Sequence, residues 1–335
     1  MKKKIILWIL YILPFPVIFV SLLIGPSDAV RPGTIFPWLS NQLFGVPKTF
    51  SGDSDLIKII LDTRLPRVLL AFLVGGSLAS AGNALQALFR NPLVDPYILG
   101  LSSGAAFGAA LAMTTPWMPL QPAAFTFGTL AVGIAYFMAR SRKSVSIVSL
   151  ILSGVIVSGI FTALLTIVQF LTDPFKLQTI AHWTMGDLHN ARWEELESAT
   201  PFCLFGFLWL FLFRWRMNVL AMGDEETRAV GLNPELEKIL ILIPATLVAS
   251  AAIAVAGVIG LIGLVVPHMI RMMIGPDNTS SLPASFTFGG AFLLIVDSFS
   301  RTLASFEIPI GVFTMLLGGP FFIFLLRRAK IGWEV

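Results

Sequence analysis

The sequence contains few of the residues from which soluble enzymes build their active sites. Only 13% of its 335 residues are charged, against roughly 25% in an average soluble domain. One cysteine, Cys203, can form neither an internal disulfide nor a cysteine-rich metal site. The chain has no HExxH zinc motif and no GxxxxGK[ST] loop, so it carries no phosphate-binding loop of its own.

Other absences narrow the possible functions further. No basic block is interleaved with aromatic residues, which excludes nucleic acid as an expected partner. Asp297 is the clearest acidic residue inside an apolar run, whereas carriers driven by protons or sodium usually need several. The apolar runs contain no polar catalytic set either, which disfavours an intramembrane enzyme. What remains is a chain that is 56% hydrophobic and is expected to lie in lipid.

Apolar runs long enough to cross a bilayer recur along the whole chain. The continuous apolar stretch 245–273 is divided near Gly257. The chain is therefore predicted to be an all-α, polytopic membrane protein with one transmembrane domain spanning residues 1–335. We place about ten spans, at 5–24, 64–88, 96–114, 122–139, 146–171, 198–213, 236–256, 257–274, 283–300 and 309–326.

The distribution of lysine and arginine predicts the orientation. The first run follows Lys2, Lys3 and Lys4 and is too long for a signal peptide, so we expect a retained span with a cytoplasmic N-terminus. An even number of spans puts the C-terminus, with its RRAK sequence, on the same side. The expected location is a bacterial or archaeal cell membrane.

The stretch RNPLVDPYILGLSSGAAFGAAL, residues 90–111, concentrates helix breakers and small residues in an apolar chain. Asp95 and Pro96 predict a helix start, with Asp95 as the N-cap. Gly100, Gly104 and Gly108 form a stripe at four-residue spacing, which favours close helix packing. Similar stripes elsewhere are typical of transporters, but they also suit a channel or an intramembrane enzyme.

Charged residues are expected at both ends of the spans. Asp297 and Arg301 lie at i, i+4 on one helix face, where they form a structural salt bridge or leave the arginine to bind a partner's carboxylate. Arg64 and Arg67 lie at the start of the second span, on the same side of the membrane. His182 and His189 are interpreted as polar residues of an outer loop rather than as metal or haem ligands.

The loop 214–238 contains the sequence GDEETRAVGL. Acidic residues followed by a glycine predict a short helix, with Asp224 as its cap and Gly231 at its end. Two interpretations stay open, a solvated surface helix and a docking helix for a cytoplasmic subunit.

Several long motifs together resemble one known family. RLPRVLLAFLVGGSLASAGNALQALFRNPLVDPYILGLSSGAAFGAAL (64–111), LILSGVIVSG (150–159), NVLAMGDEETRAVGL (218–232), GVIGLIGLVVPHMIRMM (257–273) and IPIGVFTMLLGGPFFIFLL (308–326) occur in the family's order. The chain therefore resembles the FecCD-type, or type II, permeases of ABC importers for iron–siderophore, haem and cobalamin. The resemblance covers residues 60–335.

The resemblance implies site residues as well as a fold of ten helices. It implies that a binding protein docks on Arg64, Arg67 and Arg301. It implies a path lined by residues 146–171 and 172–186. The implied ATPase-coupling segment is Gly223, Asp224, Glu225, Glu226, Thr227, Arg228, Ala229, Val230, Gly231 and Leu232. The implied inner gate is Lys143, Ser144, Val145, Ser146, Ile147 and Val148.

The expected function is therefore that of a permease subunit, not an enzyme. The resemblance implies a homodimer that works by alternating access with two cytoplasmic ATP-binding subunits and an external substrate-binding protein. ATP and magnesium belong to those partners, and no cofactor is expected on this chain. Iron–siderophore is the first expected substrate, with cobalamin, haem and molybdate behind it. The rival hypothesis is an ion-coupled secondary transporter of a similar solute.

Overall fold

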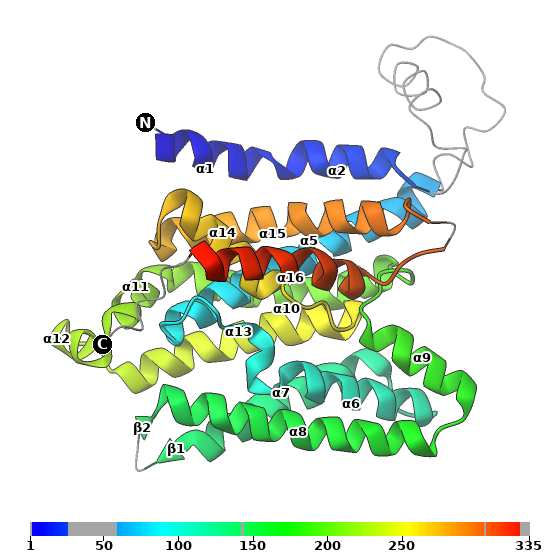
Figure 1. Ribbon diagram of the computed structural model, residues 1–335, viewed down its shortest axis with the longest axis horizontal. Coiled ribbons are helices and arrows are strands. Elements are labelled where there is room, and N and C mark those ends of the chain that lie inside the picture. Colours follow the sequence, from blue (N-terminus) through cyan, green and yellow to red (C-terminus); the bar gives the residue numbers. More distant parts are fainter. Residues whose placement is uncertain (1, 26–58, 142–143, 305, 329–335) are drawn as a thin grey trace, which may run out of the picture.

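A computed structural model describes residues 2–25, 59–141, 144–304 and 306–328 of the protein. Most of these residues form helices that run along the long direction of one bundle (Figure 1). The elements are α1 (Lys2–Ile12), α2 (Pro14–Leu23), η1 (Ile59–Arg64), α5 (Leu65–Leu88), η2 (Pro96–Leu99), α6 (Leu101–Thr114), α7 (Leu120–Ala139), β1 (Arg140–Ser141), β2 (Ser144–Val145), α8 (Ile147–Leu171), α9 (Pro174–Thr184), α10 (Trp193–Leu212), α11 (Arg214–Met222), α12 (Asp224–Ala229), α13 (Pro234–Ala256), α14 (Ile262–Ile274), α15 (Asn278–Ser300) and α16 (Ile310–Arg328).

The helices agree with the predicted spans. Within the described residues, seven helical segments are long and apolar enough to cross a membrane. Three shorter apolar helices occupy the predicted third, eighth and tenth spans, at Leu101–Thr114, Ile262–Ile274 and Ile310–Pro320. The all-α prediction is thereby confirmed. The exception is an antiparallel hairpin, β1–β2, whose two strands have two residues each.

Helix α5 is the centre of the bundle because its small residues allow neighbours to come close. Nearly all of its residues from Pro66 to Leu88 are buried. A Cβ atom at Gly75 would lie 2.4 Å from the carbonyl oxygen of Gly289 in α15, so these two backbones touch. The small-residue stripes predicted from the sequence therefore serve helix packing here.

Replacing Gly82 by alanine is expected to destabilise the fold strongly. The new Cβ would lie 1.8 Å from the carbonyl oxygen of Gly263 in α14, and backbone atoms cannot give way as a flexible side chain can. Overpacking of this kind typically costs about 1–3 kcal/mol. The measurement is the thermal unfolding temperature of the purified protein in detergent.

Gly133 in α7 provides the matched control. A Cβ at this position would meet nothing within 4 Å. Gly133→Ala is therefore expected to be neutral or slightly stabilising, because alanine favours helix over glycine by about 1 kcal/mol. Equal unfolding temperatures for Gly82→Ala and the parent protein would contradict the packing argument.

The predicted division of the stretch 245–273 is confirmed, and the structure shows how it is made. α13 ends at Ala256 and α14 begins at Ile262, with unwound backbone between them. Gly257 has φ +67° and Leu261 has φ +68°, so the residue at each end of the unwound segment has a positive φ. The Tyr97 hydroxyl donates to the carbonyl of Ile259 at 2.6 Å and accepts from its N–H at 3.1 Å. One side chain thus satisfies backbone groups that no helix satisfies.

The turn before α6 differs in part from the prediction. The Asp95 carboxylate caps as expected, accepting from the Tyr97 N–H at 3.0 Å, but the capped element is the short 3₁₀ helix η2. Gly100 has φ +81° and stands between η2 and α6, so it is a turn residue and not part of a helical stripe. Gly104 and Gly108 of the predicted stripe pack against the backbone of α7, whereas Gly100 lies against the backbone of α8.

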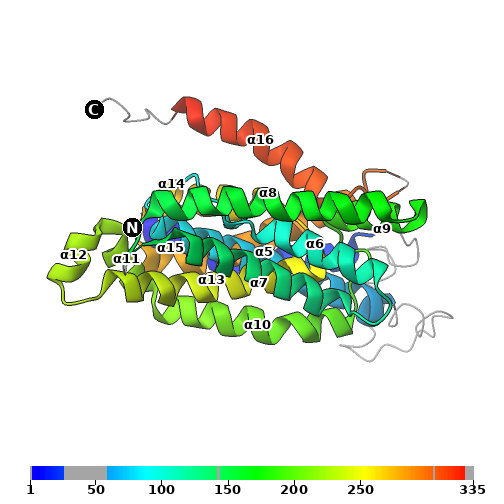
Figure 2. The ribbon, with the colours of Figure 1, turned by 90° about the horizontal axis from the view of Figure 1, so that it is seen from below.

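The two ends of the bundle carry different elements. α11, α12 and the β1–β2 hairpin lie at one end, together with the start of α1 and the end of α16 (Figure 1). Following the orientation expected from the sequence, we name this the inner end. The opposite end, which carries α9, is the outer end. Figure 2 shows α16 standing out from the body on the face opposite α10.

Candidate functional site

The predicted short helix at the inner end is present as α12. It has six residues, and the glycines on both sides, Gly223 with φ +152° and Gly231 with φ +82°, turn the chain into and out of it. Thr227 is the buried residue of α12, and its hydroxyl donates to the Gly223 carbonyl in the first turn at 2.5 Å. Most of the remaining surface is exposed, including Val230 at 58%. The helix thus presents a charged and partly apolar surface beyond the bundle.

Asp224 does not cap α12 as predicted. Gly223 is the N-cap, and the Asp224 carboxylate instead binds Arg90 and the Lys238 ammonium, the latter at 2.8 Å. Burial opposes ionisation of this carboxyl, but the hydrogen bond and charge of Lys238, together with Arg90, outweigh burial and lower its pKa. The Asp224 side chain therefore ties α12 to the bundle.

The predicted gate segment lies beside α12 at the same end. Lys143 falls outside the described residues, and Ser144 pairs with Ser141 in the hairpin. Val145 is buried, whereas Val148 in the first turn of α8 is 65% exposed. Ser146 begins α8 as its N-cap, accepting from the Ser149 N–H at 3.5 Å.

The gate segment and α12 line a common hollow of about 540 Å³. Residues 145–148 form one wall and residues 222–226 form the other, with Arg90 and Lys238 between them. The structure thus brings the predicted gate and the predicted coupling segment to the same cavity.

One face of α8 is apolar and uncovered along its length. Its other face packs on the rest of the chain, where Gly154 lies against the Ile98 carbonyl and Phe161 against the rings of Phe107 and Phe127. The uncovered face runs from the predicted gate segment to the outer end, and its most exposed large side chains are Val148, Leu152, Val155, Ile156, Ile160, Ile167, Phe170 and Leu171. An apolar face of this length needs lipid or another protein surface to cover it.

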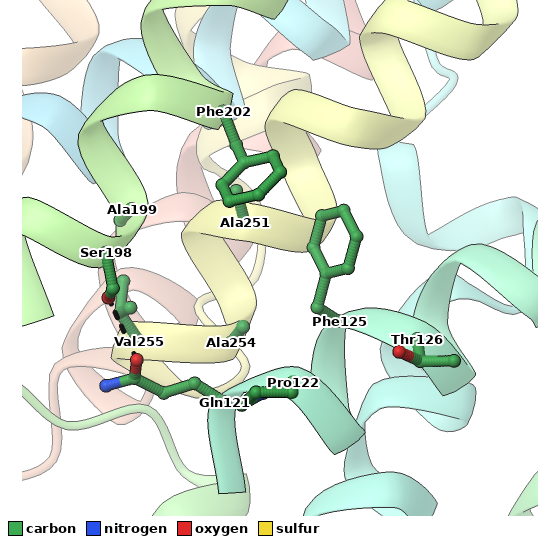
Figure 3. Close-up of a pocket in the computed structure, with 10 residues that line it drawn as sticks. All are labelled: Gln121, Pro122, Phe125, Thr126, Ser198, Ala199, Phe202, Ala251, Ala254 and Val255. Carbon is green, nitrogen blue, oxygen red and sulfur yellow. Dashed lines mark hydrogen bonds between the residues drawn. The ribbon is translucent and has the colours of Figure 1, made fainter. Parts of the chain in front are cut away.

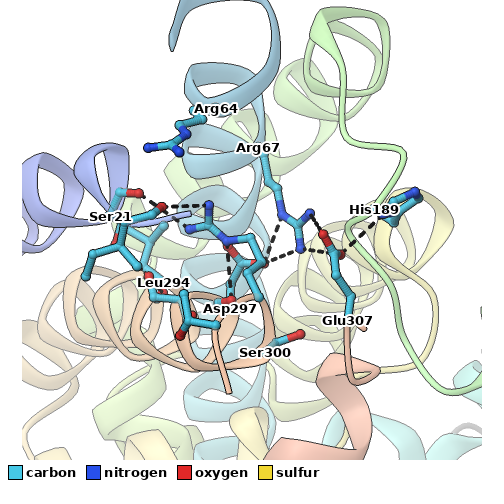
Figure 4. A network of polar contacts seen from close by, with 12 residues as sticks. Ser21, Arg64, Arg67, His189, Leu294, Asp297, Ser300 and Glu307 are labelled. Carbon is cyan, nitrogen blue, oxygen red and sulfur yellow. Dashed lines mark hydrogen bonds and ion pairs between the residues drawn. The ribbon is translucent and has the colours of Figure 1, made fainter. Parts of the chain in front are cut away.

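The three predicted docking arginines gather at the outer end, and two of them share one carboxylate (Figure 4). Arg67 donates to Asp297 Oδ1 through Nε at 3.0 Å and through Nη2 at 2.8 Å. Arg301 forms an ion pair with the other oxygen of Asp297 at 3.0 Å, while its Nε–H points to the Asp297 carbonyl at 3.4 Å. The structural salt bridge, one of the two interpretations of the i, i+4 spacing, is therefore present, and Arg67 joins it from α5.

All three arginines are buried in this structure, with 4%, 7% and 5% exposure for Arg64, Arg67 and Arg301. Arg64 donates to the Leu22 carbonyl at 2.9 Å, and Arg301 to the Ile24 carbonyl at 3.1 Å. The arginines thus also hold the end of the first span against α5 and α15.

Glu307, which the sequence analysis did not single out, completes the outer cluster. Its Oε1 accepts from Arg67 at 3.0 Å, and its Oε2 lies 3.3 Å from His189 Nδ1 (Figure 4). Burial opposes ionisation of the Glu307 carboxyl, but Arg67 and His189 outweigh burial and lower its pKa. The available signal was an acidic residue in the short segment before the last span, at the same end as the arginines.

The lowered pKa of Glu307 predicts how pH acts on this pair. Its contribution to stability is complete above the ordinary value of 4.5 and is lost as pH falls through the lower folded-state pKa. We therefore expect Glu307→Gln to lower the unfolding temperature above about pH 5 and to make little difference in stronger acid. Unfolding scans of both proteins across this range measure the difference, and an equal gap at every pH would contradict the assignment.

Each of the two predicted outer-loop histidines, His182 and His189, lies beside one carboxylate. His182 Nδ1 is 3.4 Å from Asp187, and both histidines are mostly exposed. Among the described residues no group of three or more His, Cys, Asp or Glu side chains could hold a metal ion.

A further cavity opens on a side away from α8. It has a volume of about 190 Å³ and lies between α7, α10 and α13 (Figure 3). Ser198 donates to Gln121 Oε1 at 2.9 Å at its polar edge, and Phe125 and Phe202 line the rest. α10 beside it exposes further large apolar side chains, so this cavity faces the surroundings of the bundle rather than a path along α8.

Comparisons with known proteins identify the family of the chain. A model of the FecCD transport family matches residues 10–328. The chain is 39% identical to the cobalamin import system permease protein BtuC of Halobacterium salinarum, across 90% of this chain and 80% of that protein. It is also 39% identical to the hemin transport system permease protein HmuU of Yersinia pestis, across 81% of this chain and 84% of that protein.

A solved structure shows the same fold. It is described as a metal-chelate type ABC transporter in an inward-facing conformation, and it is 33% identical to this chain. The TM-score is 0.84, and the match covers 97% of this chain and 99% of the other. The resemblance inferred from the motifs is confirmed: this protein belongs to the FecCD transport family and is a membrane-spanning permease subunit of an ABC importer.

Proposed function

We propose that two copies of this chain form the permease of an ATP-driven, binding-protein-dependent importer of a bulky metal chelate. Two separate cytoplasmic subunits bind and hydrolyse ATP with magnesium, and this chain holds no cofactor. The observation that carries the proposal is α12, an exposed short helix at the same end of the bundle as the gate segment 145–148. An ATPase subunit that binds α12 lies where a small movement reaches the gate.

The second copy follows from the uncovered face of α8. A second copy facing this surface would enclose a path between the two chains, with α8 and α9 along it. A path lined by apolar side chains such as Ile156 and Ile160 offers few fixed ligands to a solute. Specificity then belongs to the external binding protein.

The first substrate to test is an iron–siderophore, with haem, cobalamin and molybdate as the alternatives. The relatives described above are named for cobalamin and hemin, and both solutes are large metal chelates. A wide apolar path passes such solutes by size rather than by chemical recognition.

Alternating access describes the proposed cycle. ATP binding changes the spacing of the ATPase subunits and shifts α12, and the two permease chains open toward one side at a time. A partner moves such an equilibrium only through its different affinity for the two states. Both described ends, in α1 and α16, lie at the same end of the bundle as α12 and are therefore proposed to face the cytoplasm of a bacterial or archaeal cell.

Arg64, Arg67 and Arg301 are proposed to receive carboxylates of the binding protein at the outer end. Reversing the charge of Arg67 would place a second carboxylate against buried Asp297, so neutral substitutions test docking more cleanly. We expect Arg64→Gln combined with Arg67→Gln to weaken the affinity for the binding protein. The measurement is titration of the binding protein over folded, monodisperse transporter that is immobilised on a sensor surface. Unchanged affinity would remove these residues from the docking surface.

The test of the proposed function is reconstitution. Purified chain in vesicles, with a radioiron-labelled ferric siderophore and its binding protein outside, is expected to accumulate iron only when the ATPase subunits and ATP are present inside. Accumulation of iron against its gradient without these subunits would contradict the proposal and favour an ion-coupled carrier.

A further inference from the structure

Three separate elements, β2, α12 and α13, meet at the side chain of Lys238, in the first turns of α13. Its Nζ donates to the Val145 carbonyl of β2 at 3.2 Å, to Asp224 Oδ2 of α12 at 2.8 Å and to Glu235 Oε1 at 2.9 Å. An ammonium group has three N–H donors, and all three have an oxygen partner here. The residue is only 6% exposed, so water competes little for these bonds.

The backbone of Val145 is held on both of its polar groups. Its N–H donates to Glu235 Oε2 at 2.9 Å, while its carbonyl accepts from Lys238. Val145 ends β2 and is followed directly by Ser146, the N-cap of α8. The start of α8 is therefore fixed to the first turns of α13.

The same ammonium also holds α12. Asp224, the first residue of α12, binds Lys238 with one carboxylate oxygen and Arg90 with the other. The gate wall and the α12 wall both line the hollow of about 540 Å³, and Lys238, which also lines it, binds both of them.

We propose that Lys238 is a positioning residue that makes the start of α8 move together with α12. This inference rests on the proposed function, in which α12 receives the movement of the ATPase and residues 145–148 form the gate. Glu235 serves as the second contact, because it orients both the ammonium and the Val145 N–H.

Removal of the charge should separate the two walls. In Lys238→Met the side chain keeps its length but donates nothing, and Asp224 and Glu235 lose the cation between them. Like charges that share a site repel one another. Lys238→Arg keeps the charge and several donors, so it serves as the conservative variant.

The native cysteine content allows a clean measurement. Cys203 is free and fully buried in α10, so a cysteine introduced at exposed Val148 supplies the reactive thiol. The Val148→Cys permease is assembled with its ATPase subunits in vesicles that expose the inner end. Its rate of reaction with a membrane-impermeant maleimide is measured without nucleotide and after trapping with ATP and vanadate.

We expect the reaction rate to change on nucleotide trapping in the parent and in Lys238→Arg. We expect Lys238→Met to lose that change while its ATPase subunits stay bound and still hydrolyse ATP. Lys4→Met, the same substitution at an exposed lysine of α1, is the matched control and should behave like the parent.

Two results would overturn the inference. The first is a nucleotide-dependent rate in Lys238→Met equal to that of the parent. The second is loss of the response in both Lys238→Met and Lys238→Arg together with equally lowered unfolding temperatures, since that pattern indicates packing rather than charge. A parent that shows no nucleotide response would instead contradict the proposed gate, and the inference would fall with it.

A distance measurement tests the link without nucleotide or substrate. Spin labels at Glu225→Cys and Val148→Cys report the separation of α12 from the gate when labelled chains are diluted with excess unlabelled chain. A single narrow distance is expected in the Lys238 background and a broadened distribution in Lys238→Met. Identical distributions would show that Lys238 does not hold the two segments together.

Discussion

Asp297→Asn is expected to destabilise the protein severely, although the new side chain has nearly the same size. Asp297 is completely buried and is the shared carboxylate between Arg67 and Arg301. Its neutralisation leaves two buried guanidinium groups close together with Glu307 as the remaining acidic neighbour that the structure shows. Breaking a buried ion pair by removing one partner costs roughly 3–5 kcal/mol.

The measurement is the unfolding temperature in detergent together with the yield of monodisperse protein. Glu307→Gln provides the matched control, because it changes a carboxylate to an amide in the same cluster at a site with 28% side-chain exposure. We expect a clearly smaller loss for this variant, since water can solvate what remains. Equal losses of unfolding temperature for both variants would show that the destabilisation does not depend on the burial of Asp297.

Arg228→Pro is expected to abolish transport while leaving the membrane bundle folded. Proline inside a helix removes a backbone donor and clashes with the preceding turn, at a cost of about 3 kcal/mol. A helix of six residues cannot tolerate this loss, and α12 projects from the bundle rather than supporting it. The proposed ATPase contact would then lose its shape.

Arg228→Ala is the matched control for this substitution. It removes the same exposed side chain but keeps the helix, so most of the transport should remain. The measurements are uptake of the ferric siderophore into vesicles and stimulation of ATP hydrolysis by the loaded binding protein. Normal uptake by Arg228→Pro would exclude α12 from coupling, and equal losses in both variants would assign the effect to the arginine itself.

The positions of the helices were predictable because they depend on local patterns. The apolar runs reproduce the helices, and the breakers near Asp95 and Gly257 mark real interruptions. The details of those interruptions were not predictable. Gly100 reads as part of a four-residue stripe, yet it adopts φ +81° because η2 must turn before α6 can begin. Only the packing of α6 against its neighbours distinguishes the two roles.

The charged sites were predicted by position but not by partner. The i, i+4 spacing of Asp297 and Arg301 placed both residues on one helix face and made their contact one of two interpretations. The contact between Arg67 and Asp297 joins residues 230 positions apart, and no local pattern encodes it. Glu307 was not predicted for the same reason, since a single acidic residue in a short loop indicates no contact until the arginine beside it is known.

The sequence by itself determined that this chain lies in a membrane, roughly where its spans lie, and to which family it belongs. These properties follow from hydrophobic length, from helix breakers and from motifs, all of which are written along the chain. The tertiary structure alone decided which charges neutralise one another and that Lys238 joins Val145 to Asp224. Such pairs form only when separate helices are packed side by side, because a buried charge must find its partner in space rather than in sequence.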